Sequence, residues 1–355
     1  FIINGMPGSG KTIVGIFLMK YLKDSDEFKD KKIGFVVPQT SLRKTLKGIF
    51  KSIYGLKASD ILGPVDVTKQ NYDILLVDEA HRLHQYKNIS YRGQYKESCA
   101  RSGLTTESDE LDWILHQCKC SILFYDEMQV VGPAGIDVKR FQRKMQKERS
   151  KHLLKYFNLA TQMRVRGGND YISYVRELLA GTVKEKKEFL NYDLKIVTDF
   201  KEFNQLMYQK EKEVQLVRMA AGYAWDWVSK KNKSLYDIEI QGIRKQWNHC
   251  TKGWVLTKKA IDEVGCIHSV QGYDLNYGFI IMGNEIGYDT NKKRIMIRPK
   301  EYFDQNGKNT AEYGELLEYI QHIYYVLMTR GIQGTYLYIC DPDLKEYFSK
   351  YIDVQ

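Results

Sequence analysis

Short apolar runs that end in polar residues recur along the chain. The segments FIIN, ILLV, SILFY, GFIIMG and TYLYIC begin at residues 1, 74, 121, 278 and 335. Such continuous hydrophobicity is typical of strands that are buried on both faces of a parallel sheet. The stretch IVGIFLMKYL, which follows the first run, has the apolar spacing of a helix. The alternation of the two patterns predicts an α/β fold.

A glycine-rich loop joins the first predicted strand to the first predicted helix. The sequence FIINGMPGSGKT matches the phosphate-binding P-loop in its strand–loop–helix context. Its glycines let backbone N–H groups point at phosphate oxygens, and the helix N-terminus adds partial positive charge. We expect Lys11 to reach the β- and γ-phosphates and Thr12 to ligate Mg²⁺. The predicted nucleotide-binding residues are Gly5, Met6, Pro7, Gly8, Ser9, Gly10, Lys11 and Thr12.

A second acidic site follows the run at residues 74–77, in the sequence LLVDEAHR. Ligands of α/β sheets bind at the carboxyl ends of strands, where Asp78 and Glu79 stand. We expect Asp78 to hold Mg²⁺ with Thr12, and Glu79 to orient and deprotonate the attacking water. The second carboxylate favours ATP hydrolysis over mere nucleotide binding.

Further polar residues follow or precede the later predicted strands. Taken singly, each fits a helix cap or a solvated turn, but the ordered set is not expected by chance. Its members are Asp126, Gln129, Arg164, His268, Gln271, Gly272, Asp274 and Arg330.

This set resembles the motifs of superfamily 1 helicases, from GMPGSGKT through LLVDEAHR, FYDEMQ, LATQMR and IHSVQGYDLNY to YVLMTRG. The resemblance implies that Asp126 and Gln129 sense the γ-phosphate and that Arg164 and Arg330 stabilise transition-state charge. It also implies that Gln271 and Gly272 contact the nucleotide and link it to a nucleic-acid strand. The letters DEAH belong to superfamily 2, but that class has a different third motif and an arginine-rich sixth motif.

A closer resemblance is to the Schlafen group-3-type DNA/RNA helicase domain. It rests on VRMAAGYAWDWVSKKN, IHSVQGYDLNYGFIIMG and YYVLMTRGIQGTYLYICD, and it covers nearly the whole chain. Family members often have Glu where Asp274 stands. The resemblance implies ATP and Mg²⁺ as cofactors and single-stranded DNA or RNA as a partner. An attached upstream domain, such as a nuclease, is a further candidate partner.

Composition adds to this picture. The formal net charge of +10 suits a polyanionic partner, although a merely basic proteome would explain it equally. His116, Cys118 and Cys120 would need another close ligand pair to bind zinc, so we expect reduced thiols, as in the cytoplasm. No apolar run reaches the length of a membrane span. The opening FIINGMPG is not a signal peptide, and we expect the natural protein to extend upstream.

The motif positions predict two RecA-like P-loop domains with parallel sheets and a nucleotide cleft between them. Residues 1–150 hold motifs I to III, and residues 151–355 hold motifs IV to VI. The polar segment 84–109 resembles a mobile loop, and Trp225 and Trp227 are expected to pack rather than to stack on bases. The basic segment 138–155 reads as a helix that either tracks a phosphate backbone or is simply solvated.

We therefore predict an ATP-dependent superfamily 1-type helicase or translocase motor that acts as a monomer. The alternative is a nucleotide-dependent switch ATPase that regulates an attached domain or partner without translocation. The short stretch between Lys11 and Asp78 leaves no room for the subdomain that larger superfamily 1 helicases insert there, which favours the switch more than in those enzymes.

Overall fold

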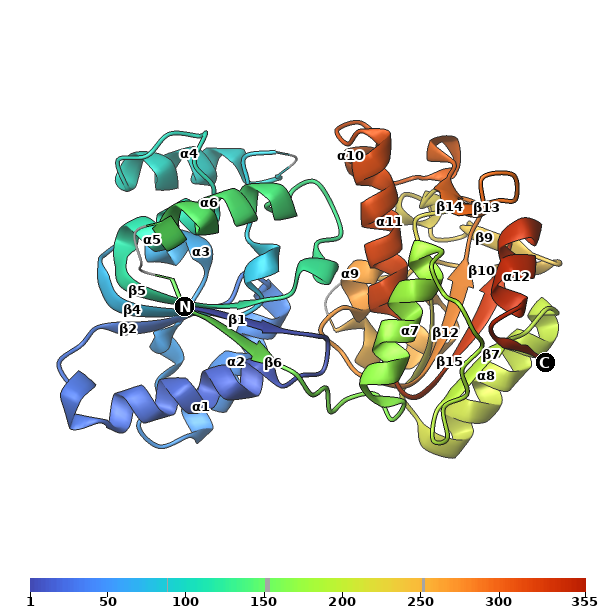
Figure 1. Cartoon of the computed structure of the whole chain (residues 1–355), viewed down its shortest axis with the longest axis horizontal. Helices are drawn as coiled ribbons and strands as arrows, with labels where there is room; N and C mark the ends of the chain where they lie inside the picture. The colour runs from blue at the N-terminus through green and yellow to red at the C-terminus, as the bar shows by residue number, and fades with distance from the viewer. Residues whose placement is uncertain (88, 151–153, 251–252) are drawn as a thin grey trace. The chain divides into compact units, whose positions relative to one another are not determined.

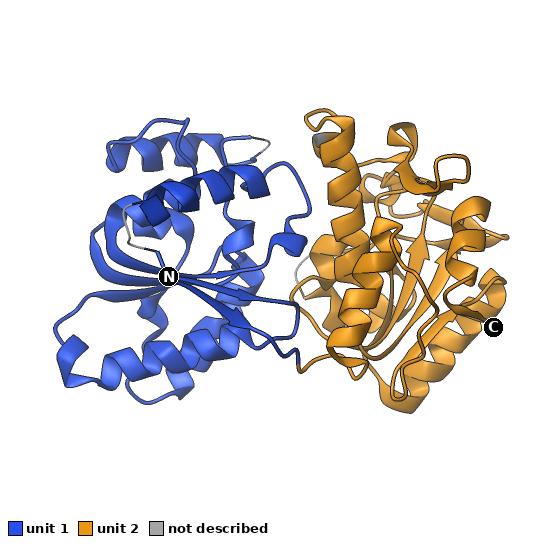
Figure 2. Cartoon of the chain, viewed as in Figure 1, with its two compact units in different colours: residues 1–162 blue, residues 163–355 orange. Residues whose placement is uncertain are grey.

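The computed structural model describes residues 1–87, 89–150, 154–250 and 253–355. The chain divides into two compact units, residues 1–162 and 163–355, which Figure 2 shows in blue and orange. Helices flank a parallel sheet in both of them (Figure 1).

Unit 1 contains a six-stranded sheet in the order β3-β2-β4-β5-β1-β6, and every pairing in it is parallel. Its strands are β1 (Ile2–Gly5), β2 (Ile33–Val36), β3 (Ile61–Leu62), β4 (Tyr72–Val77), β5 (Cys118–Tyr125) and β6 (Tyr156–Leu159). Its helices are α1 (Lys11–Asp24), α2 (Thr40–Ser52), α3 (Pro64–Val67), α4 (Arg92–Arg101), α5 (Glu110–Gln117) and α6 (Val138–Ser150). The strand that ends before Asp126 therefore lies between the P-loop strand β1 and β4, which leads to Asp78 and Glu79.

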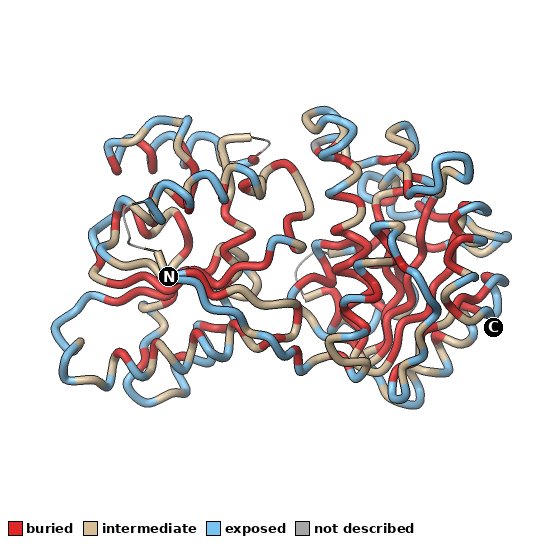
Figure 3. The backbone as a smooth tube through the Cα atoms, viewed as in Figure 1, coloured by how far each residue is buried: buried red, intermediate tan, exposed pale blue. Residues whose placement is uncertain are grey.

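The two faces of this sheet bury separate apolar clusters, and Figure 3 shows its central strands as largely buried, whereas the edge strand β6 is mostly exposed. Helix α1 packs one side against the sheet through positions that recur every four residues, Lys11, Gly15 and Met19. A Cβ atom on Gly15 would lie 3.1 Å from Phe35 and 3.2 Å from Phe124. The absent side chain therefore lets α1 approach the sheet closely, which brings the start of the helix to the carboxyl edge of the strands.

Strand β6 explains where unit 1 ends. Its residues Tyr156 to Leu159 pair in parallel with Ile2 to Gly5 of β1. Those backbone hydrogen bonds tie the segment to the first sheet, so the compact unit continues to Gln162. The domain boundary expected near residue 150 lies before this strand, so the observed boundary falls later in the chain.

Unit 2 contains a second six-stranded sheet, in the order β11-β8-β12-β15-β7-β16, and it is also parallel throughout. Its strands are β7 (Asp193–Ile196), β8 (Val217–Ala221), β11 (Val264–Gly265), β12 (Leu275–Met282), β15 (Gly331–Ile339) and β16 (Asp353–Val354). Its helices are α7 (Gly168–Ala180), α8 (Phe200–Val214), α9 (Ile267–Val270), α10 (Gln305–Lys308), α11 (Tyr313–Met328) and α12 (Pro342–Ser349). Two antiparallel hairpins are added, β9 (Ile238–Ile240) with β10 (Ile243–Lys245), and β13 (Ile286–Asp289) with β14 (Arg294–Ile297). The predicted fold class, α/β with two RecA-like units and parallel sheets, is confirmed.

The tryptophans of unit 2 take part in packing. Trp247 belongs to the main apolar cluster of this unit, and Trp225 and Trp227 pack against that cluster while half-buried. Trp254 is fully buried. Trp225 and Trp227 therefore pack against the core of unit 2, as expected.

The described residues of the segment 84–109 include a helix, so the segment is not a loop throughout. It contains α4, whose buried Tyr95 lies 4.5 Å from the ring of Trp113, centroid to centroid. Tyr91 donates a hydrogen bond of 2.8 Å to the buried Glu110, which also accepts from the backbone N–H of His84. The tyrosines of this otherwise polar segment form an aromatic cluster that packs the segment against α5.

The basic segment forms α6 over residues 138–150, whereas residues 151–153 lie outside the described part of the chain. Two of its cations face inward. Arg140 and Lys144 contact Asp109 Oδ2 at 2.7 and 2.6 Å, and the Asp109 side chain is fully buried. These ion pairs give Arg140 and Lys144 a partner within unit 1, and contact of the helix with a phosphate backbone stays a prediction. Arg143 and Lys147 are exposed.

The ion pairs of α6 give a stability prediction. Replacing Arg140 and Lys144 by Ala should lower the free energy of unfolding by about 3–5 kcal/mol, because Asp109 would be left as a buried, uncompensated charge. The matched pair Arg143→Ala and Lys147→Ala removes the same formal charge from the exposed face and should change it by about 0.5 kcal/mol or less. Urea unfolding of both double variants provides the measurement. Equal losses would show that Asp109 does not depend on α6.

Candidate functional site

The loop between β1 and α1 curls over its own strand. Gly8 and Gly10 both have φ of +81°, a left-handed conformation that glycine adopts without strain. A Cβ atom on Gly5 would lie 2.2 Å from Ser9 Oγ and 3.2 Å from Ser9 Cβ, so a side chain there would force Ser9 to move. The first N–H groups of α1, which begins at Lys11, have no acceptor within the helix. Those donors are therefore available to phosphate oxygens.

Lys11 is buried at the centre of this loop. Its Nζ donates hydrogen bonds to the carbonyl oxygens of Gly5 at 2.5 Å and Met6 at 3.1 Å. The same nitrogen lies 3.5 Å from Asp126 Oδ2, and both side chains are 6% exposed. Asp126 in turn accepts a hydrogen bond of 2.8 Å from Gln129 Nε2. The residues expected to contact and sense phosphate thus form one connected chain.

Asp78 is linked to the loop through Thr12. The Thr12 hydroxyl donates a hydrogen bond of 2.7 Å to Asp78 Oδ2, and the backbone N–H of Glu79 donates to Oδ1 at 3.0 Å. Burial, together with the neighbouring negative charge of Glu79, raises the pKa of Asp78 to about 7. A hydroxyl and a buried carboxylate held together in this way are oxygen ligands of the kind that Mg²⁺ prefers.

Glu79 has an unusual backbone conformation, with φ of 53° and ψ of 43°. Such a left-handed conformation is uncommon for a residue with a side chain, and it clusters at functional sites. Glu79 Oε2 lies 3.0 Å from His81 Nε2 and 3.2 Å from Arg82 Nε. Burial opposes ionisation of Glu79, but His81 and then Arg82 outweigh it and hold its pKa well below the ordinary value. Burial thus favours the neutral form of Asp78, whereas the neighbours of Glu79 favour its ionised form.

The candidate residues of unit 2 gather at the amino ends of β12 and β15. Arg164 forms an ion pair with Asp274, and the backbone N–H of Leu275 donates to the carbonyl oxygen of Arg330 at 3.0 Å. The Arg330 side chain is buried. Gln271 is buried in the turn after α9, next to Gly272, which has φ of +91°.

Sequence reasoning missed three partners in these two groups of residues. His81 and Arg82 contact the predicted base Glu79, and Asp274 holds Arg164. A cation three residues after a carboxylate, on a helical turn, is a local signal that would have indicated the Arg82 contact. The Arg164–Asp274 pair spans too many residues for any local pattern to reveal.

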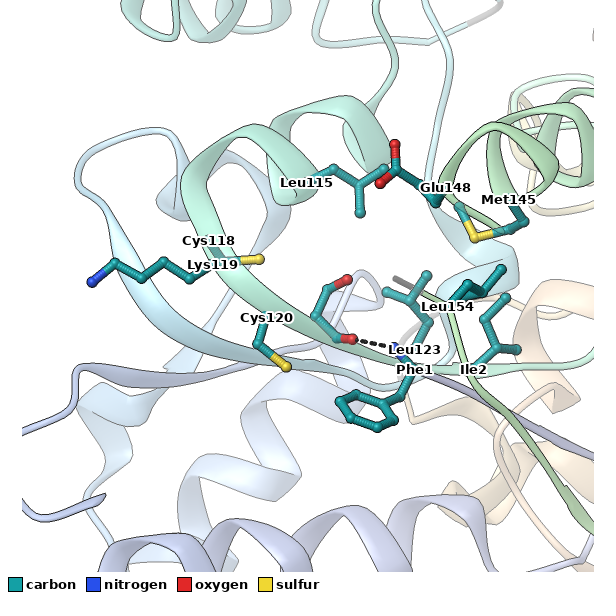
Figure 4. A pocket seen from close by; sticks show the side chains of 11 residues that line it. Phe1, Ile2, Leu115, Cys118, Lys119, Cys120, Leu123, Met145, Glu148 and Leu154 are labelled. Atoms are coloured by element: carbon teal, nitrogen blue, oxygen red, sulfur yellow. Dashed lines mark hydrogen bonds between the residues drawn. The ribbon is translucent and has the colours of Figure 1, made fainter. Parts of the chain in front are cut away.

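A cavity of about 310 Å³ lies elsewhere in unit 1, at the amino ends of β1 and β5. Figure 4 shows Cys118 and Cys120 lining it together with apolar side chains such as Leu115 and Met145. No group of three or more His, Cys, Asp or Glu residues is arranged to hold a metal in the described part of the chain. The zinc alternative for His116, Cys118 and Cys120 therefore has no support there. Among the described helices, none is both long and apolar enough to cross a bilayer.

The P-loop of unit 1 fits a nucleotide phosphate chain. Ser9 Oγ is buried without a hydrogen-bond partner within the protein, and the Lys11 ammonium is buried beside it. Buried polar atoms are normally satisfied, so an unsatisfied hydroxyl in a loop of donors is expected where a ligand oxygen binds. The chemistry of the donor set, an ammonium, hydroxyls and backbone N–H groups, matches phosphate.

Fold and motif order together define a P-loop α/β protein built from two parallel sheets. The chain belongs to the family described as Schlafen group 3, DNA/RNA helicase domain, which it matches over residues 1–341. It is 25% identical to the uncharacterized protein YPL245W of Saccharomyces cerevisiae, over 98% of this chain and 83% of that protein.

Two solved helicase structures are more distant. The arterivirus nonstructural protein 10 helicase is 12% identical with a TM-score of 0.43, over 98% of this chain and 61% of that chain. This chain thus spans about three-fifths of the viral protein's length. A structure of Pif1 helicases at forked DNA is 12% identical with a TM-score of 0.34, over 95% of this chain and 87% of that chain.

The raised pKa of Asp78 predicts a pH dependence of stability without nucleotide. Between about pH 4 and pH 7 the folded protein retains a proton that the unfolded chain releases, so stability falls as pH rises. The side chain of Asp78→Asn does not ionise, so the variant does not lose stability from this group as pH rises. At pH 8 the variant should exceed the wild type by about 4 kcal/mol, and near pH 4 the two should coincide. Urea unfolding at both pH values measures the difference, and a difference independent of pH would contradict the prediction.

Proposed function

We propose that this chain is an ATP-dependent motor of the superfamily 1 type that moves along a single strand of nucleic acid. The observation that carries the proposal is the buried chain from Lys11 through Asp126 to Gln129, beside the Thr12–Asp78 hydrogen bond. Membership of a DNA/RNA helicase domain family supports the same conclusion. The six cysteines, which are all thiols, suit a cytoplasmic location.

Unit 1 supplies the binding and hydrolysis residues in this proposal. The loop from Gly5 to Thr12 binds the phosphates. Lys11 Nζ exchanges its hydrogen bonds to the carbonyl oxygens of Gly5 and Met6 for bonds to the β- and γ-phosphate oxygens. Thr12 and Asp78 would hold Mg²⁺, which when bound neutralises charge that develops on the transferred phosphoryl group. Asp126 and Gln129 respond to the presence of the γ-phosphate because Asp126 contacts Lys11 and Gln129 donates to Asp126.

Glu79 acts as the general base. It must accept a proton from the attacking water, and its contacts with His81 and Arg82 keep it ionised. The same contacts make Glu79 a weak base, since a lowered pKa disfavours proton uptake. We therefore propose that the contact between Glu79 and Arg82 loosens in the active state.

We assign the stabilisation of transition-state charge to two arginines, Arg164 and Arg330. Arginine side chains that approach the γ-phosphate stabilise the charge of the transition state. Gln271 and Gly272 contact the nucleotide and, with the rest of motif V, couple its state to the strand. The ion pair with Asp274 keeps the Arg164 side chain oriented, so we propose a positioning role for this aspartate.

Lys11 and Glu79 should give different defects. Lys11→Ala should lower ATP affinity and abolish turnover, because the ammonium is lost from the phosphate site. Glu79→Gln should bind ATP normally and fail to hydrolyse it, because only the base is lost. Binding of a fluorescent ATP analogue and single-turnover hydrolysis separate the two. Lys20→Ala, on the same helix α1 but paired with Asp24, serves as the matched control. Equal loss of ATP affinity in both site variants would refute these roles.

The two arginines should affect turnover more than binding. Arg164→Ala and Arg330→Ala should each reduce the ATP hydrolysis rate by about 10³–10⁵-fold while ATP affinity changes little. Arg166→Ala, an exposed arginine two residues from Arg164, is the control and should leave the rate unchanged. Near-normal hydrolysis in both site variants would remove unit 2 from the catalytic site.

A further inference from the structure

A cysteine, a histidine and a glutamate lie in contact in unit 2, outside the residues proposed for ATP hydrolysis. Cys250 Sγ lies 3.5 Å from His249 Nε2, within hydrogen-bonding reach for sulfur. His249 Nδ1 lies 2.9 Å from Glu263 Oε2. A nucleophile in contact with a base, which a third group orients, is the arrangement that activates thiols in covalent chemistry.

The backbone around the thiol is held on both sides. Asn248 donates from its backbone to the carbonyl oxygen of Val264 at 3.0 Å, and its Oδ1 accepts from the backbone N–H of Cys266 at 3.2 Å. Its Nδ2 donates to the carbonyl oxygen of Cys250 at 3.1 Å. These bonds fasten residues 248–250 to β11 and the residue that follows it. The thiol and imidazole are therefore positioned by the fold.

Glu263 determines which nitrogen of His249 carries the proton. Its Oε2 accepts hydrogen bonds from the backbone N–H of His249 at 3.0 Å and from Trp254 Nε1 at 2.8 Å. An ionised carboxylate can only accept, so Nδ1 of His249 must be the protonated nitrogen. The lone pair of Nε2 then faces Cys250 Sγ and can take the thiol proton. Among the described contacts of His249, Cys250 and Glu263 are the titratable groups.

The surroundings of Cys250 differ from those of the other thiols. The His249 side chain is 34% exposed and Cys250 is half-buried, so a small co-reactant can approach. Burial raises the pKa of Cys118 and of Cys340 to about 12, which keeps those thiols protonated at neutral pH. Reactivity should therefore be concentrated at Cys250.

We propose that Cys250 is a modification site, a thiol activated by His249 and Glu263 that exchanges with small-molecule disulfides of the glutathione class. The thiol proton moves to His249 Nε2, and the thiolate sulfur attacks one sulfur of the disulfide. A new S–S bond forms as the old one breaks, and the departing thiolate takes the proton from His249. The products are a mixed disulfide on Cys250 and one free small thiol, so no other oxidant is required.

The place of the site in the fold connects it to motif V. Glu263 directly precedes β11, and α9, which carries His268, follows that strand. A Cβ atom on Gly265 would lie 2.5 Å from the Trp254 ring, so this segment has no spare room. An adduct that displaces His249 from Glu263 would therefore act on the segment that leads into motif V.

The test measures the reaction of each cysteine with oxidised glutathione in the whole chain, without nucleotide. Quenched samples are digested, and mass spectrometry gives a rate constant for each of the six thiols between pH 6 and pH 9. An ordinary thiol loses about tenfold in rate for each pH unit below its pKa of about 8.5. Cys250 should react at least about tenfold faster than Cys340 at pH 7, with a flatter pH dependence.

Variants separate activation from mere exposure. His249→Asn should lower the Cys250 rate at pH 7 by about tenfold and restore the steep pH dependence, and Glu263→Gln should act in the same direction. His116→Asn, an exposed histidine two residues from Cys118, is the matched control and should change nothing. If His249→Asn does not fold, the wild-type pH profile decides alone. An ordinary, steep profile for Cys250, or an unchanged rate in folded His249→Asn, would overturn the proposal.

Discussion

The burial of Lys11 at the carboxyl edge of three parallel strands is the constraint on which the arrangement of unit 1 depends. A buried ammonium costs several kcal/mol unless charges and hydrogen bonds compensate it. Asp126 and the carbonyl oxygens of Gly5 and Met6 provide that compensation. The parallel order β4-β5-β1 makes it possible, because the strand that ends before Asp126 lies beside the strand that ends at Gly5.

The same sheet edge also holds two adjacent carboxylates, and their contacts divide the charge between them. Asp78 is buried and contacts the Thr12 hydroxyl, whereas Glu79 contacts the Arg82 guanidinium and the His81 imidazole. Burial therefore favours the neutral form of the first and the neighbours favour the ionised form of the second. A divalent cation would change this balance by stabilising both charges, so nucleotide with its metal would lower the electrostatic cost of placing the two carboxylates side by side.

Much of the fold could be predicted from the sequence, because continuous apolar runs are specific to buried parallel strands and the P-loop has a strict pattern. The partners of individual charges could not. Nothing in the local pattern around Arg140 and Lys144 indicates Asp109, which is far away in sequence, as their ion-pair partner. The sequence pattern did not reveal the helix within residues 84–109, because Tyr95 carries a polar hydroxyl and does not mark an apolar position. In the structure its ring packs against Trp113. Long-range contacts decided each of these cases, and local patterns do not contain them.

The central claim is that ATP turnover in this chain is coupled to a nucleic-acid strand. The most direct measurement is the steady-state ATP hydrolysis rate with single-stranded DNA, with single-stranded RNA, and with neither. A motor should show a low basal rate that at least one strand stimulates, with stimulation that weakens as salt increases because phosphate contacts release counterions. A measurable rate that neither strand alters at any salt concentration would contradict the motor and favour a nucleotide-dependent switch.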